Sequence, residues 1–174
     1  MNHPIDISSP LGKLRLRPER ERDQKFRFEL FCNSRPPEWR MAGFDPSLLR
    51  QIMRQQFEAQ TVSYRAQFPR ARFDIIELDG APVGRIVVNR PGAVVHIIDQ
   101  AVVPELRGRG IGTCVMENLM EEAAEGGISV RLKVASDNDP SMRLYLRLGF
   151  AVIDRTEMYV EMEWRDKELP AGPD

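Results

Sequence analysis

A seven-residue segment combines glycines and arginines in a way that fits phosphate binding. It reads Arg107-Gly108-Arg109-Gly110-Ile111-Gly112-Thr113 and lies where an apolar run leads into a helical pattern. Glycines let the backbone approach a ligand closely, and the amide N–H groups at a helix start point one way and carry partial positive charge. We therefore expect this segment to cradle a phosphate group, with added positive charge from Arg107 and Arg109.

The segment differs from two common nucleotide-binding motifs. No Gly-Lys-Ser/Thr sequence follows it, as a Walker loop requires. Its glycines have the spacing GxGxG, whereas the dinucleotide fingerprint needs GxGxxG and an acidic residue after the next strand. A solvated arginine-rich turn, or a piece of an RNA-binding protein, is the alternative interpretation.

Two titratable residues, His96 and Asp99, interrupt an apolar run over residues 93–103. A histidine can relay a proton near neutral pH, and a carboxylate in an apolar strand needs a partner or a function. Side chains alternate across a strand, so these two lie on opposite faces unless a bulge intervenes. We expect only one of them to line a cleft, and a hydrogen-bonded structural role is the alternative for His96.

Asn138 and Tyr145 are seven residues apart in a predicted helix. Seven residues make about two helical turns, so both side chains lie on one face and could contact the same ligand. The alternative is that Tyr145 is a core aromatic residue beside Phe150.

In these residues the sequence resembles the GCN5-related N-acetyltransferase (GNAT) superfamily. The pyrophosphate loop of that family reads Gln/Arg-x-x-Gly-x-Gly/Ala, which Arg107, Gly110 and Gly112 match. A second family pattern has an Asn and then Leu-Tyr, a basic residue and Leu-Gly-Phe. It is matched by Asn138 and residues 144–150.

The resemblance implies an acetyl-CoA site. Backbone groups of Val102 and Val103 would pair with the pantetheine arm, and the amides of residues 107–113 would bind the pyrophosphate. Asn138 would contact the cofactor near its pantetheine. Tyr145 would act as general acid at the thioester sulfur, since reference pKa values of about 10 for tyrosine and about 8.5 for a thiol permit this proton delivery.

The resemblance leaves the general base open. His96 lies near the position where many family members carry a catalytic glutamate on this strand. An amine of pKa near 10 must lose a proton before it can attack a thioester at neutral pH. His96, Asp99 or a water chain could accept that proton.

Hydrophobic periodicity predicts the elements that position these residues. In the amino-terminal half we expect a strand at 14–17, a helix over 19–32, a helix from Asp45-Pro46 to Phe68, and a hairpin over 73–88 that turns at Asp79-Gly80. The loop at Pro36, Pro37, Glu38 and Trp39 is either an acceptor lid or an anchoring plug.

The carboxyl-terminal half is predicted as a strand over 93–103, a helix over 110–125 and a parallel strand over 130–134. A helix capped by Asp139 with Pro140 at its first position follows, and then a hairpin of residues 150–155 and 158–164. Residues 170–174 read as a frayed tail.

The composition fits one domain. The chain has 174 residues, 42% of them hydrophobic and 29% charged, with a net charge of −1. Residues 1–90 carry 16 basic against 11 acidic residues, and residues 91–174 carry 9 against 15, so the two parts differ in sign at +5 and −6. The near-zero total argues against a nucleic-acid binder, although the uneven distribution of charge is compatible with one basic face.

Cysteine and histidine are too few and too widely spaced for a structural zinc site. Cys32 and Cys114 are the only cysteines, and they fit no CxxC pattern. Cys114 is expected to be a buried apolar residue rather than a nucleophile. No apolar stretch is long enough for a membrane span, and the first ten residues do not resemble a signal peptide, so we expect a cytoplasmic protein.

These observations predict an α+β fold in which helices flank a mixed, mostly antiparallel sheet in three layers, over residues 8–166 with a tail at 167–174. The predicted function is acetyl transfer from acetyl-CoA to a primary amine on a small molecule or a protein, without metal, nucleic acid or membrane. A non-catalytic module that binds CoA as a sensor is the alternative. The acceptor is left open, as is the oligomeric state, a homodimer included. The excess of arginine over lysine fits a bacterial source.

Overall fold

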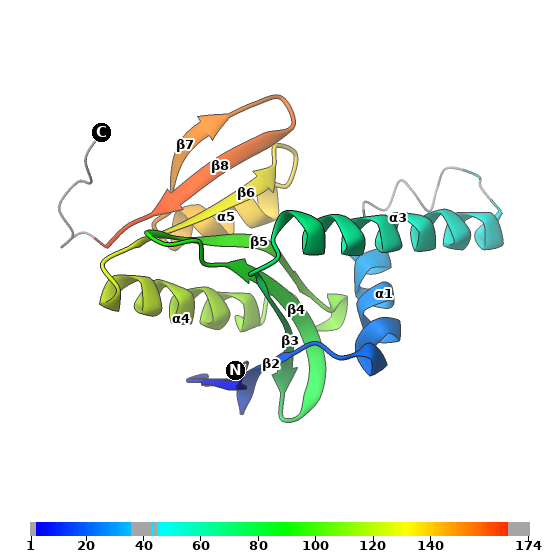
Figure 1. Cartoon of the computed structure of the whole chain (residues 1–174), viewed down its shortest axis with the longest axis horizontal. Coiled ribbons are helices and arrows are strands. Elements are labelled where there is room, and N and C mark those ends of the chain that lie inside the picture. The colour runs from blue at the N-terminus through cyan, green and yellow to red at the C-terminus, as the bar shows by residue number, and fades with distance from the viewer. Residues whose placement is uncertain (1–2, 36–42, 44, 167–174) are drawn as a thin grey trace.

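A computed structural model describes residues 3–35, 43 and 45–166 of the chain. Its eight strands form one sheet in the order β1-β2-β3-β4-β5-β6-β8-β7 (Figure 1). The strands are β1 (Ile5–Ile7), β2 (Leu14–Pro18), β3 (Arg72–Leu78), β4 (Ala81–Asn89), β5 (Val94–Val102), β6 (Ser129–Ala135), β7 (Ala151–Arg155) and β8 (Tyr159–Trp164). The helices are α1 (Gln24–Asn33), α3 (Pro46–Gln67), α4 (Ile111–Glu125) and α5 (Asp139–Arg147), with 3₁₀ turns at Glu21–Asp23 and Pro104–Leu106.

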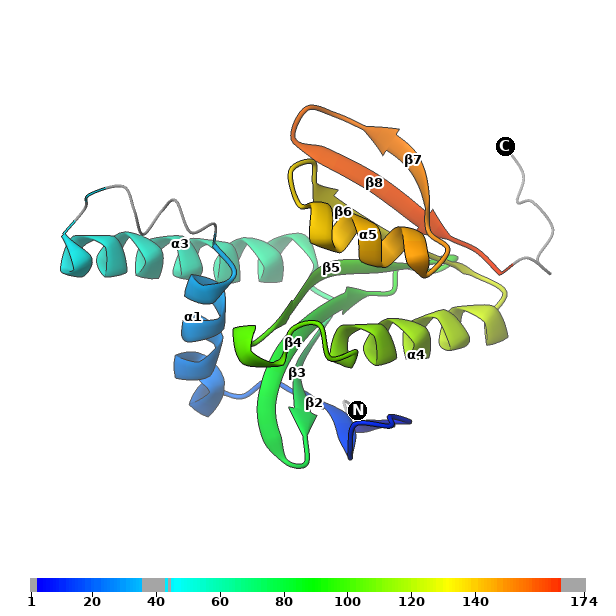
Figure 2. The same ribbon diagram turned by 180° about the vertical axis from the view of Figure 1, so that it is seen from behind.

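The sheet is antiparallel except where β5 and β6 run parallel. α4 connects these two strands, as expected for a parallel pair that needs a crossover. α4 and α5 lie on one side of the sheet (Figure 2), and α1 and α3 pack together on the other. The predicted α+β class with a mostly antiparallel, helix-flanked sheet is confirmed.

The main hydrophobic core lies between the sheet and the helices α4 and α5. Alternate strand residues such as Ile86, Val88 and Val95 are buried there against Val115 and Leu119 of α4. A smaller cluster of Phe28, Phe31, Met53 and Phe57 joins α1 to α3. The two clusters keep the helices of each side in place over the strands that carry the site.

β5 and β6 separate halfway along their length. They pair only from Val94 opposite Ser129 to Ile97 opposite Leu132. Beyond that point β5 stays with β4 as far as Val102, whereas β6 stays with β8 as far as Ala135. The second half of β5 therefore has one edge that no strand of the described chain covers, and unpaired backbone groups on such an edge are available to a ligand.

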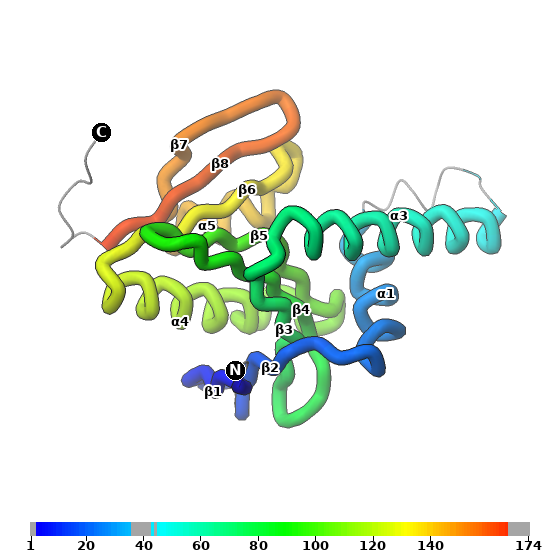
Figure 3. Tube along the Cα trace, in the orientation of Figure 1, coloured from blue at the N-terminus to red at the C-terminus, as the bar shows by residue number. Residues whose placement is uncertain are grey.

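The sheet begins earlier than the sequence indicates. β1 pairs with β2 and adds residues 5–7 ahead of the expected start of the domain at residue 8. Figure 3 shows this short segment near the amino terminus, at the outer edge of the sheet. Three residues are too few for a pattern of alternation, so the sequence carries no strand signal there.

Two predicted helix starts were wrong. The helix expected over residues 19–32 begins at Gln24, because the amide of Glu19 still donates to the Phe73 carbonyl of β3 and a 3₁₀ turn follows. The cap of α5 is Asn138 and not Asp139, since the Asn138 side chain accepts from the amide of Ser141.

Most other local expectations hold. Asp45 caps α3 as predicted by accepting from Ser47 and Leu48. Asp79 and Gly80 both have positive φ in the turn between β3 and β4, as a two-residue hairpin requires. The loop at Pro36, Pro37, Glu38 and Trp39 and the tail at 167–174 lie outside the described residues.

Candidate functional site

A cavity of about 610 Å³ opens where β5 and β6 separate. Four segments line it: the end of β5, the loop after it, the start of α4, and one face of α5. These segments contribute residues 100–102, 106–108, 110–113, and 138, 140, 141, 144, 145 and 147, with Ser34 from the end of α1.

The start of α4 presents free backbone donors to this cavity. Gly110 is the N-cap, and no side chain caps the helix. The first helical hydrogen bond joins the Cys114 amide to the Gly110 carbonyl over 2.9 Å, so the amides of residues 111–113 precede the helical ladder. Gly108 and Gly110 have φ of 72° and 92°, a region that favours glycine. The helix start is thus built to receive an anion.

Arg107 acts within the protein rather than as a free cation. Its Nε donates to the Val102 carbonyl at 3.0 Å and its Nη2 to the Asn33 carbonyl at 3.0 Å. These bonds tie the glycine loop to β5 and to α1. Arg109 is not among the residues that line the cavity. Arg107 lines the cavity and keeps its positive charge, because both of its partners are neutral carbonyls, so the loop offers that charge as well as its amides.

The two valines expected to pair with pantetheine differ. Val102 lines the cavity, although its carbonyl already accepts from Arg107. The amide of Val103 donates to the Val83 carbonyl over 2.9 Å and so belongs to the sheet. Of the pair, Val102 alone has a position from which it could reach a ligand in the cavity.

Asn138 and Tyr145 both line the cavity, as their spacing predicts. The carbonyl oxygen of the Asn138 side chain is held by the Ser141 amide, which leaves its NH₂ group as the donor for a ligand. The Tyr145 ring packs at 5.7 Å from the Phe150 ring, so it also belongs to the edge of the core. Burial and the nearby Asp99 charge raise the pKa of Tyr145 to about 12.

A β-bulge places Asp99 and His96 on one face of β5. Val88 is opposite Ile97 and Val87 is opposite Asp99, so Ile98 is the extra residue. The bulge occurs where β5 leaves β6, and the face in question is the one toward α1 and α3. In a regular strand His96 and Asp99 would lie on opposite faces, and the bulge is what brings them to the same face.

Neither Asp99 nor His96 lines the cavity, but Asp99 directly precedes Gln100, which does. The Asp99 carboxylate accepts from Arg85 at 3.1 Å and its side chain is 31% exposed. Burial raises its pKa, while Arg85 and Arg35 oppose that rise. His96 lies opposite Arg131 in the paired half of the strand, and burial together with Arg131 lowers its pKa.

Two residues of the site were missed from the sequence. Gln100 donates to the Gly112 carbonyl at 3.3 Å and so links β5 to the start of α4. Arg85 is 7% exposed in the middle of β4, where it bridges Asp99 and Glu19. Both residues could have been found from the sequence, because each is a polar residue within an apolar run. Such a residue needs a partner when it is buried.

Residues 28–150, which are more than half of the chain, match the profile of the acetyltransferase (GNAT) family. The chain belongs to the GNAT family. A stretch of 88 residues is 35% identical to an uncharacterised N-acetyltransferase of Methanocaldococcus jannaschii. That match covers 45% of this chain and 38% of the relative.

Solved structures show the same GNAT fold. The PaiA N-acetyltransferase of Thermoplasma acidophilum, in complex with coenzyme A, aligns with a TM-score of 0.66 over 88% of this chain and 99% of that one, at 17% identity. RimJ of Mycobacterium smegmatis, in complex with CoA-disulfide, aligns with a TM-score of 0.62 over 98% and 89%, at 19% identity. At these identities the likeness extends to the fold.

The described residues hold neither a candidate metal site nor a helix that could cross a membrane. Among residues 3–35, 43 and 45–166, no three His, Cys, Asp or Glu side chains are grouped closely enough to hold a metal ion. In the same part of this GNAT chain, none of the helices has the length and apolar character needed to cross a membrane.

Proposed function

We propose that the chain transfers an acetyl group from acetyl-CoA to a primary amine of a small molecule or a protein. The observation that carries this proposal is the cavity in which the uncapped start of α4, Asn138 and Tyr145 meet the uncovered edge of β5. A diphosphate suits the α4 amides, because they are oriented donors at the positive end of a helix. The amide-rich pantetheine arm suits the edge of β5 beside Val102.

The fit of acetyl-CoA depends on space as well as on donors. The positive φ of Gly110 and the absence of side chains at Gly108, Gly110 and Gly112 leave the backbone of the loop accessible from the cavity. When bound, acetyl-CoA supplies the activated thioester carbonyl. The protein residues then orient the two reactants, which makes a bimolecular reaction effectively unimolecular.

Asp99 is the group we propose to accept the proton of the acceptor amine. It lies beyond the point where β5 and β6 separate, and its raised pKa brings a carboxylate closer to neutral pH, where a base acts best. Neither residue lines the cavity, but His96 lies in the paired half of β5, whereas Asp99 directly precedes Gln100 of the lining and its charge acts on Tyr145. We therefore favour Asp99, directly or through a water molecule, over His96.

Tyr145 is the group we propose to donate at the departing sulfur. With a pKa of about 12 it stays protonated throughout the neutral range. Complete proton transfer to a thiolate of pKa about 8.5 would be uphill, so its hydrogen bond in the transition state is the expected contribution.

The experiment that tests the function is calorimetric titration of the purified chain with acetyl-CoA and with CoA, followed by thiol release against a panel of primary amines. The panel should contain polyamines, amino acids, aminoglycosides and short peptides with free amino termini. Binding with amine-dependent thiol release supports the transferase. Binding without release on any amine supports the CoA sensor. A chain that binds neither compound contradicts both.

A further inference from the structure

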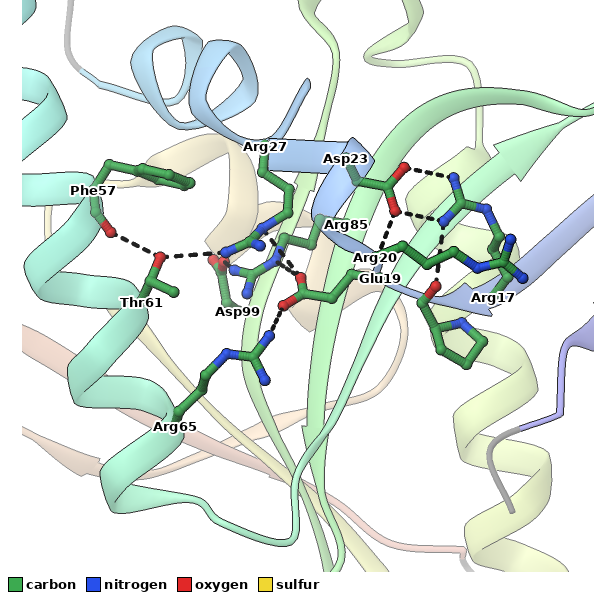
Figure 4. Close-up of polar contacts among 11 residues, drawn as sticks. Arg17, Glu19, Arg20, Asp23, Arg27, Phe57, Thr61, Arg65, Arg85 and Asp99 are labelled. Carbon is green, nitrogen blue, oxygen red and sulfur yellow. Dashed lines mark hydrogen bonds and ion pairs between the residues drawn. The ribbon is translucent and has the colours of Figure 1, made fainter. Parts of the chain in front are cut away.

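We infer that Arg85 holds the carboxylate of Asp99 in place for its reaction, and that the buried carboxylate of Glu19 in turn holds Arg85. This inference rests on the proposed role of Asp99. Figure 4 shows the chain of contacts, which runs from Asp99 through Arg85 to Glu19 and ends at Arg27 and Arg65.

Glu19 is the fixed point of this group. Its side chain is 3% exposed, and it contacts three arginines from three different elements. Arg27 of α1 lies 3.2 Å away, Arg85 of β4 lies 3.1 Å away, and Arg65 of α3 completes the set. A buried carboxylate that is surrounded in this way cannot move without leaving buried arginines unpaired, which would be costly.

Arg85 uses separate nitrogens for its two partners. Nε donates to Oε2 of Glu19 and Nη1 donates to Oδ2 of Asp99, each over 3.1 Å. The Arg85 guanidinium also lies 5.6 Å from the centre of the Phe73 ring. Because a guanidinium is planar and rigid, fixing one edge on Glu19 fixes the direction in which the other edge meets Asp99.

Asp99 needs such a hold because it follows a bulge. The extra residue Ile98 interrupts the pairing with β4 next to Asp99, at the point where β6 has already departed. Among the hydrogen bonds of the described residues, the Asp99 side chain has one side-chain partner, Arg85. A bulged strand constrains the direction of a carboxylate less well than a regular strand does, so the carboxylate needs a partner to orient it. Orientation matters because a displacement of about 1 Å can lower a reaction rate considerably.

The charged and titratable groups around Asp99 come from each element that packs against it. Arg85 of β4 and Arg35, which follows α1, favour its ionised form. Tyr64 of α3 and Tyr145 of α5 are near enough for the Asp99 charge to raise their pKa values. Arg27 and Arg65 are already neutralised in part by Glu19. Removing the positive charge of Arg85 should therefore raise the pKa of Asp99 further.

Two substitutions separate the charge of Arg85 from its geometry. Arg85→Gln removes the charge, so the pKa of Asp99 should rise further. Arg85→Lys keeps a charge but cannot reach two carboxylates from two nitrogens. The Lys variant should keep the pKa of Asp99 near its original value, while kcat falls about tenfold and the KM for acetyl-CoA is unchanged.

The measurement is a pH titration of the Asp99 carboxyl carbon by ¹³C NMR, assigned with Asp99→Asn. It needs no acceptor, so it reports on Arg85 even if the amine panel yields no activity. Arg90→Gln is the matched control, because it removes an arginine from a two-point ion pair with Glu122 on α4. That control should leave the Asp99 titration unchanged.

For an amine that releases thiol, the same variants are compared in the pH profile of kcat/KM. The inference is supported if Arg85→Gln moves the acidic limb of the profile upward together with the NMR value. The inference is overturned if the pKa of Asp99 measured by NMR is unchanged in Arg85→Gln. It is also overturned if that pKa rises while the acidic limb of the kcat/KM profile stays where it was. Bound CoA, measured by calorimetry, confirms that each variant is folded; if Arg85→Gln does not fold, an unchanged kcat in Arg85→Lys overturns the inference.

Discussion

Tyr145 combines a packing position with the catalytic role proposed for it. Its ring packs against Phe150 at the edge of the core, and its side chain lines the cavity. The ring supplies packing, whereas the hydroxyl supplies a hydrogen-bond donor that stays protonated because the pKa is about 12. A substitution that removes only the hydroxyl therefore tests the chemical role alone.

Tyr145→Phe should lower kcat by about 100-fold, the lower end of the range for general acid catalysis. Calorimetry should give an affinity for CoA within about twofold of the original, because the ring and the α4 amides remain. Tyr159→Phe is the matched control, since Tyr159 is half exposed on β8 and outside the cavity lining. An unchanged kcat in Tyr145→Phe would exclude the hydroxyl from catalysis.

Asp99→Asn should abolish the acidic limb of the kcat/KM profile. The folded protein raises the pKa of Asp99 above 3.8, so the fraction ionised, and with it the rate, increases with pH through that raised value. The comparison is His96→Asn, measured with the same amine over pH 5–9. That variant should keep the limb, and a limb lost in His96→Asn but kept in Asp99→Asn would transfer the role of base to His96.

At the scale of elements, the start of α4 is the feature most specific to anion binding. The helix has no side-chain cap and no acidic residue in its first turn, so neither competes with a bound anion. Gly110 makes this geometry possible through its φ of 92°. A Cβ at Gly110 would meet no close neighbour, so strain in the backbone and not crowding is what a substitution introduces.

Gly110→Ala should therefore weaken CoA binding by about tenfold, since a left-handed residue other than glycine costs about 1–2 kcal/mol and the loop will relax away from it. Gly126→Ala is the control at the other end of the same helix, where φ is −81° and alanine is compatible. Calorimetric titration with CoA compares the two variants. Equal affinities in both would contradict the assignment of the loop.

At the scale of the molecule, the site joins parts of the chain that are far apart in sequence. The end of α1, the second half of β5, the start of α4 and one face of α5 all contribute to the cavity. Arg107, in the loop before α4, bonds to two of these parts, to β5 at Val102 and to the end of α1 at Asn33. A ligand in the cavity should consequently stabilise the whole fold and not one loop.

CoA at 100 times its dissociation constant should raise the free energy of unfolding by about 2.7 kcal/mol, which corresponds to a rise in Tm of about 5–10 °C for a domain of this size. Differential scanning calorimetry checks the value. Pantetheine without the nucleotide should give a clearly smaller rise at the same concentration, because it lacks the diphosphate for the α4 amides. Equal rises in Tm with CoA and with pantetheine would show that the α4 amides contribute no binding energy through the diphosphate.

Short-range features of this protein were predictable from the sequence. The glycine loop, the start of α3 at Asp45 and the turn at Asp79-Gly80 each depend on a few neighbouring residues, whose conformational preferences are strong. The shared face of Asn138 and Tyr145 follows from helical periodicity alone. The crossover from β5 through α4 to β6 was equally predictable, since a strand, a helix and a strand in about forty residues favour a parallel pair of strands.

Pairing between distant strands decided the rest. The bulge at Ile98 and the separation of β5 from β6 after Ile97 depend on how β4 and β6 meet β5, and no local preference in that run encodes them. The bulge turns Asp99 toward α3, and the separation of the two strands opens the cavity. The contacts of Arg85 with Asp99 and Glu19 join residues 14 and 66 positions apart. The residue types and their local spacing identify the groups that could do chemistry. Which of these groups meet depends on burial and long-range pairing, and these exist only in the folded chain.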